Sequence, residues 1–100
     1  MTTYLITRHL GAVDWMARQG VVVDTVLSHL DPNLIKRGDT VIGTLPVHLA
    51  AVVCERGAKF VCLTLDLPPD LRGGEIKVED MDAWGARLEV FVIHAERNGT

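Results

Sequence analysis

Three consecutive residues, Thr7, Arg8 and His9, have side chains that could hold and cleave a phosphodiester. An arginine can clamp a phosphate oxygen through two N–H groups, or stabilise the charge that grows on phosphorus during displacement. A histidine exchanges protons near neutral pH, so it could take one from an attacking hydroxyl or give one to a leaving oxygen. The segment therefore predicts an anion site in which Arg8 and His9 are the catalytic candidates.

Each of these residues also has an ordinary structural interpretation. Arg8 could be a solvated side chain that pairs with Asp14 or Asp66. His9 could be a helix-start residue that only hydrogen-bonds the backbone, and a threonine such as Thr7 is common at strand ends and helix caps. The residue types alone leave both interpretations open.

Two further loops are expected at the same edge of the sheet, at residues 43–46 and 66–73. Thr44 could give its hydroxyl to a phosphate, although capping of the next helix explains it better. His48 could contact a ligand or only solvent, and Trp15 could stack on a base, although tryptophan on such a helix usually packs in the core. The expected ligand-binding residues are Thr7, Gly11, Trp15, Gly43, Thr44, Leu45, Pro46, His48, Asp66 and Arg72.

The elements that must position these loops alternate between strands and helices. Apolar patterning predicts strands at residues 3–7, 21–30, 40–43, 59–66 and 87–94, and helices at residues 12–19, 47–56 and 78–84. The mixed faces of 21–30 favour an edge strand, whereas the apolar run 59–66 is typical of a strand covered on both faces. The pattern predicts one small α/β domain over residues 1–100, a Rossmann-like sheet of four to five mainly parallel strands flanked by helices.

Charge, motifs and cysteine placement exclude several classes of function. Ten Lys and Arg residues oppose thirteen Asp and Glu residues, so the net charge is −3, and the chain lacks the excess positive charge that binding of long nucleic acid needs. No dinucleotide, P-loop or metal-ligand motif occurs in the sequence, so we expect no cofactor and no metal. Cys54 and Cys62 lie in apolar runs and are expected to be buried reduced thiols, which with the lack of a long apolar segment favours a cytoplasmic protein without membrane contact.

Several segments carry a resemblance that covers almost the whole chain. They are TRHLGAVDW at 7–15, HLDP at 29–32, GDTVIGTLPVHLAAVVCERGA at 38–58, LTLDLPPDLRG at 63–73 and DMDAWGARLEVFV at 80–92. In this order they resemble a small CRISPR-associated Csx-type family of type III systems, the VVA-type ring nuclease group. His48 is a departure, because a small amide residue is expected there more often.

The resemblance implies a CARF-like homodimer that binds cyclic oligoadenylate, most of all cyclic tetra-adenylate, and cleaves it without a metal. The ribose 2′-hydroxyl would attack its own 3′ phosphate and leave a 2′,3′-cyclic phosphate. From loop position and residue chemistry, Arg8 would stabilise the developing charge, His9 would transfer a proton, Thr7 and Thr44 would hold phosphates, and Arg72 could close over the ring. Two alternatives stay open: a sponge or sensor that binds the ring without cleaving it, and an interaction subunit that docks on a CRISPR effector.

Overall fold

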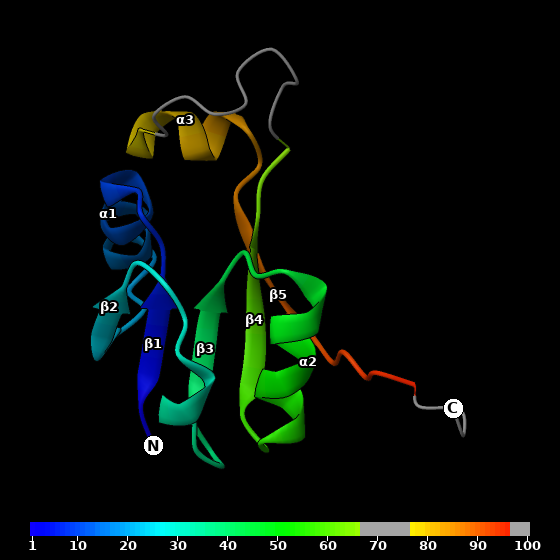
Figure 1. Cartoon of the computed structure of the whole chain (residues 1–100). Helices are drawn as coiled ribbons and strands as arrows, with labels where there is room; N and C mark the ends of the chain where they lie inside the picture. The colour runs from blue at the N-terminus through cyan, green and yellow to red at the C-terminus, as the bar shows by residue number, and fades with distance from the viewer. Residues whose placement is uncertain (67–76, 97–100) are drawn as a thin grey trace.

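Five strands form a single sheet in the order β2-β1-β3-β4-β5 (Figure 1). The computed structural model describes residues 1–66 and 77–96. The strands are β1 (Thr3–Ile6), β2 (Thr25–Leu27), β3 (Thr40–Gly43), β4 (Lys59–Thr64) and β5 (Arg87–Phe91). The first four run parallel, and β5 pairs antiparallel with β4. This arrangement confirms the prediction of a small, mainly parallel Rossmann-like sheet.

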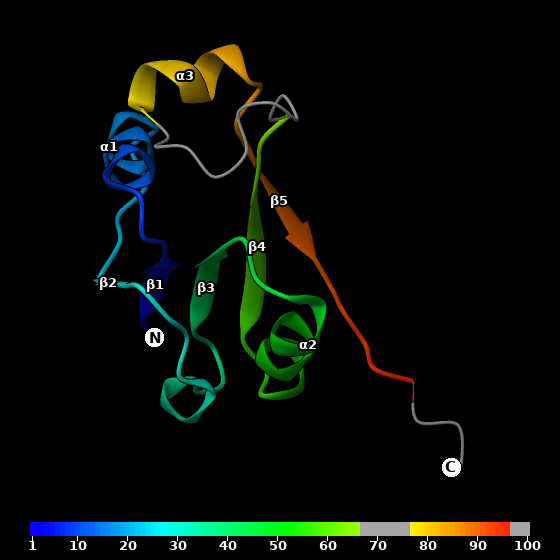
Figure 2. The same ribbon diagram turned by 45° about the horizontal axis from the view of Figure 1, so that its top comes forward.

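Helices cover both faces of the sheet (Figure 2). One face packs against α1 (Leu10–Arg18) and α3 (Val78–Ala83), and the other against α2 (Val47–Glu55) and the short 3-10 helix η1 (Pro32–Leu34). The strands supply alternating apolar side chains to the two sides: Leu5 and Ile42 face α1, whereas Ile6 and Val41 face α2. A central parallel strand is buried on both faces, which explains the nearly continuous apolar runs in the sequence.

The direction in which the chain connections run along the sheet reverses between β1 and β3. From β1 the chain passes through α1 to β2 on one side, and from β3 it passes through α2 to β4 on the other side. The loops that leave these neighbouring strands therefore diverge at the carboxyl edge. In open α/β sheets this point, where the strand order reverses, is the usual place for a ligand.

The edge strand β2 is much shorter than the predicted strand 21–30, although its edge position is confirmed. Gly20 ends α1 with a left-handed φ of 75°, and the Val21 N–H donates to the Met16 carbonyl at 3.2 Å, so the first residues cap the helix. The Asp24 carboxylate then accepts a hydrogen bond from the Thr3 N–H at 2.8 Å, and strand pairing begins only at Thr25. Beyond Leu27 the chain turns toward η1.

Other boundaries differ from the predictions by a few residues. Strands β1, β4 and β5 end before the predicted residues 7, 66 and 94, and α1 begins at Leu10 instead of residue 12. The Asp66 N–H donates to the Trp84 carbonyl at 2.8 Å, which draws the chain after β4 toward the end of α3 and out of the ladder. Cys54 and Cys62 are free thiols and only partly buried, not fully buried as expected. In the part of the chain that the structure describes, no helix has the length and apolar character to span a bilayer.

Candidate functional site

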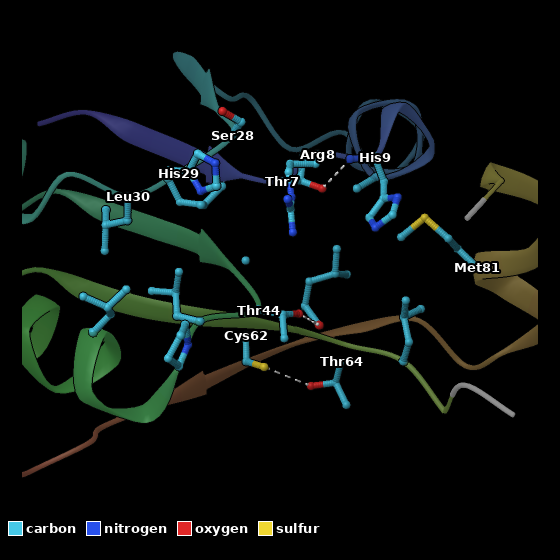
Figure 3. A pocket seen from close by; sticks show the side chains of 18 residues that line it. Thr7, Arg8, His9, Ser28, His29, Leu30, Thr44, Cys62, Thr64 and Met81 are labelled. Carbon is cyan, nitrogen blue, oxygen red and sulfur yellow. Dashed lines mark hydrogen bonds between the residues drawn. The ribbon is translucent and has the colours of Figure 1, made fainter. Parts of the chain in front are cut away.

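A pocket of about 690 Å³ opens at the carboxyl ends of the four parallel strands (Figure 3). Its volume is in the range of small-molecule sites. Each of these strands contributes the residues at its end, and α1, α2 and α3 contribute one side chain each. The lining consists of residues 6–9, 28–30, 43–46 and 62–65, together with Ala12, Leu49 and Met81.

The loop after β1 is held so that one hydroxyl remains able to donate. The Thr7 N–H donates to the Leu27 carbonyl at 2.9 Å, and the Thr7 Oγ1 accepts from the His9 N–H at 3.1 Å. A hydroxyl has one proton and two lone pairs, and among the described residues the Thr7 O–H proton has no acceptor, so it is available to a ligand. The backbone turn that presents Arg8 and His9 is thus fixed by the same side chain that could bind a phosphate oxygen.

Arg8 presents an exposed, unpaired cation to this pocket. Across residues 1–66 and 77–96, its guanidinium has neither an ion-pair nor a hydrogen-bond partner. The alternative pairing with Asp14 is not seen, and Asp66 pairs instead with Arg87 at 3.2 Å. A free guanidinium at the mouth of a cavity suits an anionic ligand, because it can form two parallel charge-assisted hydrogen bonds.

His9 lies at the N-cap position of α1 and projects toward the pocket (Figure 3). Its Nδ1 is buried and has no hydrogen-bond partner among the described residues. Buried polar atoms without partners are rare, and they concentrate where function requires them. Because Nδ1 is shut off from solvent, Nε2 is the ring nitrogen that remains available to a ligand.

The loop after β3 depends on a glycine and on a threonine that is already engaged. A Cβ on Gly43 would lie 2.6 Å from the Ile6 carbonyl oxygen, and the φ of Gly43 is 156°. The Thr44 Oγ1 donates its proton to the Leu63 carbonyl at 2.9 Å. The N-cap of α2 is Pro46, with no side-chain hydrogen bond, so the interpretation of Thr44 as a helix cap is wrong. Thr44 lines the pocket but offers a ligand only lone pairs.

The structure brings six of the expected binding or catalytic side chains and one glycine to the pocket. These residues are Thr7, Arg8, His9, Gly43, Thr44, Leu45 and Pro46.

Four expected ligand contacts lie elsewhere, and Arg72 lies outside the described residues. Trp15 is only 4% exposed, and its indole Nε1 donates to the Asp82 carboxylate at 3.0 Å, so it is a core residue and has no face open for a base. Gly11 is buried in α1 without lining the pocket, and His48 is exposed on α2 outside it. Asp66 is also outside the lining, and its hydrogen bond to Arg87 raises the pKa of that guanidinium above its ordinary value.

Residues 28–30 line the pocket but were missed by the sequence analysis. Ser28 and His29 were predicted to lie within the strand 21–30. In the structure β2 ends at Leu27, so both residues lie in the loop that follows it. The signal that could have found them is the rule already applied to the other strands, since the residue after any parallel strand lies at this edge. The pocket therefore contains a second histidine.

The lining also has an apolar part and a thiol. Leu30 and Leu45 pack against the apolar cluster that includes α2, and Leu49 comes from α2 itself. The Thr64 Oγ1 hydrogen-bonds the Cys62 Sγ at 3.5 Å.

Among residues 1–66 and 77–96, no three His, Cys, Asp or Glu side chains gather closely enough to hold a metal ion. The pocket thus combines unpaired polar groups for an anion with an apolar wall for a flat or hydrophobic group.

Comparison with protein-family models identifies the family of the chain. Residues 4–94 match the model of the family described as "Putative CRISPR-associated protein (Cas_VVA1548)". No curated protein and no solved structure matches the chain. The family match spans nearly the full sequence: it covers the whole pocket lining and, among the described elements, all residues of the helices and strands except Thr3, the first residue of β1. The chain belongs to the Cas_VVA1548 family of CRISPR-associated proteins.

Proposed function

We propose that the protein is a ring nuclease of type III CRISPR defence, which binds cyclic oligoadenylate, cyclic tetra-adenylate above all, and cleaves it without a metal. The observation that carries the proposal is the presence of the unpaired Arg8 guanidinium and the His9 imidazole in one pocket. The CRISPR association of the family supports a substrate drawn from CRISPR signalling. Cleavage of the ring would switch off the response that it activates.

The reaction would be an internal displacement at phosphorus. The ribose 2′ oxygen attacks the adjacent 3′ phosphorus, the new O2′–P bond forms as the P–O5′ bond breaks, and a 2′,3′-cyclic phosphate remains. Arg8 would neutralise the charge that grows on the phosphoryl oxygens, and the Thr7 hydroxyl would donate to one of them. His9 would transfer a proton through Nε2. The apolar wall of Leu30, Leu45 and Leu49 would receive an adenine.

The size and charge of the chain fit a ring better than a long strand. A net charge of −3 gives little hold on many phosphates, whereas a ring of four nucleotides has only four. We expect a homodimer in the cytoplasm, because a two-fold axis lets each protomer present the same pocket to half of a symmetric ring.

The test is to incubate the purified protein with cyclic tetra-adenylate in EDTA and to resolve the products by chromatography with mass detection. Linear products that end in a 2′,3′-cyclic phosphate are expected. An intact ring after many equivalents of enzyme and long incubation would contradict the nuclease assignment.

A binding module without catalysis is the second candidate. It is favoured by the fact that the free Arg8 guanidinium and the free Thr7 O–H suffice to hold a phosphate and need no proton transfer. Calorimetry with the same ring distinguishes the candidates: tight binding without turnover identifies a sponge or sensor. No affinity for rings of any size would favour a subunit that docks on a CRISPR effector.

A further inference from the structure

We propose that His29 is a second proton-transfer residue of this pocket and acts as the acid that protonates the leaving 5′ oxygen. The inference rests on the proposed nuclease function and deepens it. Two observations carry it: His29 and His9 both line the pocket, and they come from different strand ends with Arg8 between them in Figure 3.

The position of His29 follows from the pairing of β1 with β2. The Thr7 N–H donates to the Leu27 carbonyl at 2.9 Å, so the chain that leaves β2 starts beside the loop that presents Arg8 and His9. Two residues later His29 is exposed and lines the pocket. Among the described residues, its imidazole makes neither a hydrogen bond nor an ion pair.

The chemistry requires two proton transfers on opposite sides of phosphorus. The attacking 2′ oxygen loses its proton to a base as the O2′–P bond forms, and the leaving 5′ oxygen gains a proton from an acid as the P–O5′ bond breaks. In-line displacement puts these two oxygens on opposite sides of the phosphorus atom. Two imidazoles that line the pocket with a guanidinium between them in Figure 3 match this requirement, since each would serve one oxygen while Arg8 contacts the phosphoryl group.

The ionisable groups of the described lining leave few other donors. They are Arg8, His9, His29 and Cys62, and no carboxylate is among them. Arginine does not give up its proton in proteins. The partly buried Cys62 Sγ accepts a hydrogen bond from the Thr64 Oγ1, and a thiol is in general a weaker acid than an imidazolium ion. Asp31, the carboxylate nearest to His29 along the chain, accepts a hydrogen bond from the Asn33 N–H at 3.0 Å and caps η1. His29 is therefore the available partner for His9.

The surroundings of the two rings assign their roles. An acid must carry two N–H groups before the reaction starts, and both need acceptors. The exposed ring of His29 can keep both N–H groups in water. His9 has one nitrogen buried without a partner, so it suits the base, which begins the reaction with a single N–H.

The experiment compares His29→Gln and His29→Ala with His94→Ala, a histidine that is exposed after β5 and absent from the pocket lining. Single-turnover cleavage of cyclic tetra-adenylate should slow by about 100-fold or more in both His29 variants and stay unchanged in the control. The affinity for the ring should change little. The pH–rate profile of the wild type should be bell-shaped, and the variants should lose its alkaline limb, which a merely structural role would not remove.

A ring with one 5′-bridging sulfur provides the decisive measurement, because a thiolate leaves without protonation. Both His29 variants should cleave the sulfur linkage at a rate close to the wild type, whereas His9→Ala should stay slow. Wild-type cleavage of the normal ring with no effect of the His29 variants would overturn the inference and leave the nuclease function standing. Slow variants that the sulfur linkage does not rescue would also overturn it. Absence of cleavage by the wild type would overturn both proposals.

Discussion

The two ends of the parallel strands treat their polar groups in opposite ways. At the amino end, Asp39 is only 5% exposed, and both of its carboxylate oxygens are bonded, one to the Thr2 N–H and one to the Lys36 N–H, each at 2.9 Å. At the carboxyl end, the Arg8 guanidinium and the His9 Nδ1 have no partners among the described residues. Both ends consist of loops from the same strands.

The difference separates a structural charge from a functional one. A buried carboxylate with two backbone donors is satisfied by the fold, so it ties the N-terminal segment to the turn before β3. A cation and an imidazole without partners contribute little to the fold and are left for a ligand. Substitutions test this difference: loss of an unpaired side chain at the carboxyl end should lower activity, and loss of the Asp39 carboxylate at the amino end should lower stability.

The largest effect is expected from Arg8→Ala at the carboxyl end. Loss of the only guanidinium in the described pocket lining should lower single-turnover cleavage of cyclic tetra-adenylate by about 100- to 1000-fold. Arg8→Lys should restore only part of the rate, because an ammonium is a point charge without a planar fork. The melting temperature should not change, since the side chain has no partner within residues 1–66 and 77–96. An unchanged rate would remove Arg8 from the site.

The next effect concerns the backbone at the carboxyl end, where Gly43 is the last residue of β3. In Gly43→Ala the new methyl group would meet the Ile6 carbonyl oxygen at 2.6 Å, where β1 and β3 pair. We expect a loss of about 3 kcal/mol in the free energy of unfolding, measured in urea. Gly20→Ala is the matched control, because no atom lies within 4 Å of its new methyl group and only the left-handed φ costs energy, about 1 kcal/mol. Equal losses would show that the contact with Ile6 relaxes freely.

Asp39→Asn tests the amino end and should lower the melting temperature by several degrees without changing the cleavage rate at a temperature where both proteins are folded. Hydrogen bonds from the Lys36 and Thr2 N–H groups hold the pKa of Asp39 below its ordinary value of 3.8. A lowered folded pKa stabilises the protein fully above the ordinary value and loses this effect as the pH falls through the folded pKa.

The difference in melting temperature between wild type and Asp39→Asn should therefore be full at neutral pH and shrink below about pH 4. Thermal unfolding followed by circular dichroism at pH 7, 4 and 3 measures it. A difference that is the same at all three values would show that the amide, and not the lost charge, disturbs the turn.

Local patterns were enough to predict the parts of this molecule that depend on neighbours in sequence. The apolar run in β4, the glycine that ends α1 and the Thr7-Arg8-His9 loop each follow from a few adjacent residues. Parallel strands put their loops at one edge, so the pocket and seven of its residues could be predicted before the sheet order was known.

The errors arose where a distant residue decides the outcome. Trp15 is removed from the site by Asp82, 67 positions away, and Asp66 by Arg87, 21 positions away. The end of β2 depends on how far β1 can pair with it, which is why His29 was hidden inside a predicted strand. Such contacts follow from the sheet order and from α3 packing on α1, and local patterning contains neither.

The smallest expected effect is a difference in ligand affinity between variants of Thr7 and Thr44, two threonines of the same pocket. Thr7→Val removes a hydroxyl whose proton is free for a phosphate, so binding of cyclic tetra-adenylate should weaken about tenfold, the value of one hydrogen bond of roughly 1.4 kcal/mol. Thr44→Val removes a hydroxyl whose proton is already donated to Leu63, so it should lower the melting temperature slightly and leave the affinity within twofold. Calorimetry and thermal unfolding on both variants measure the contrast. If Thr44→Val weakens binding as much as Thr7→Val, the Thr44 hydroxyl must leave Leu63 when the ring binds, and a bond formed inside the fold would no longer mark a side chain as structural.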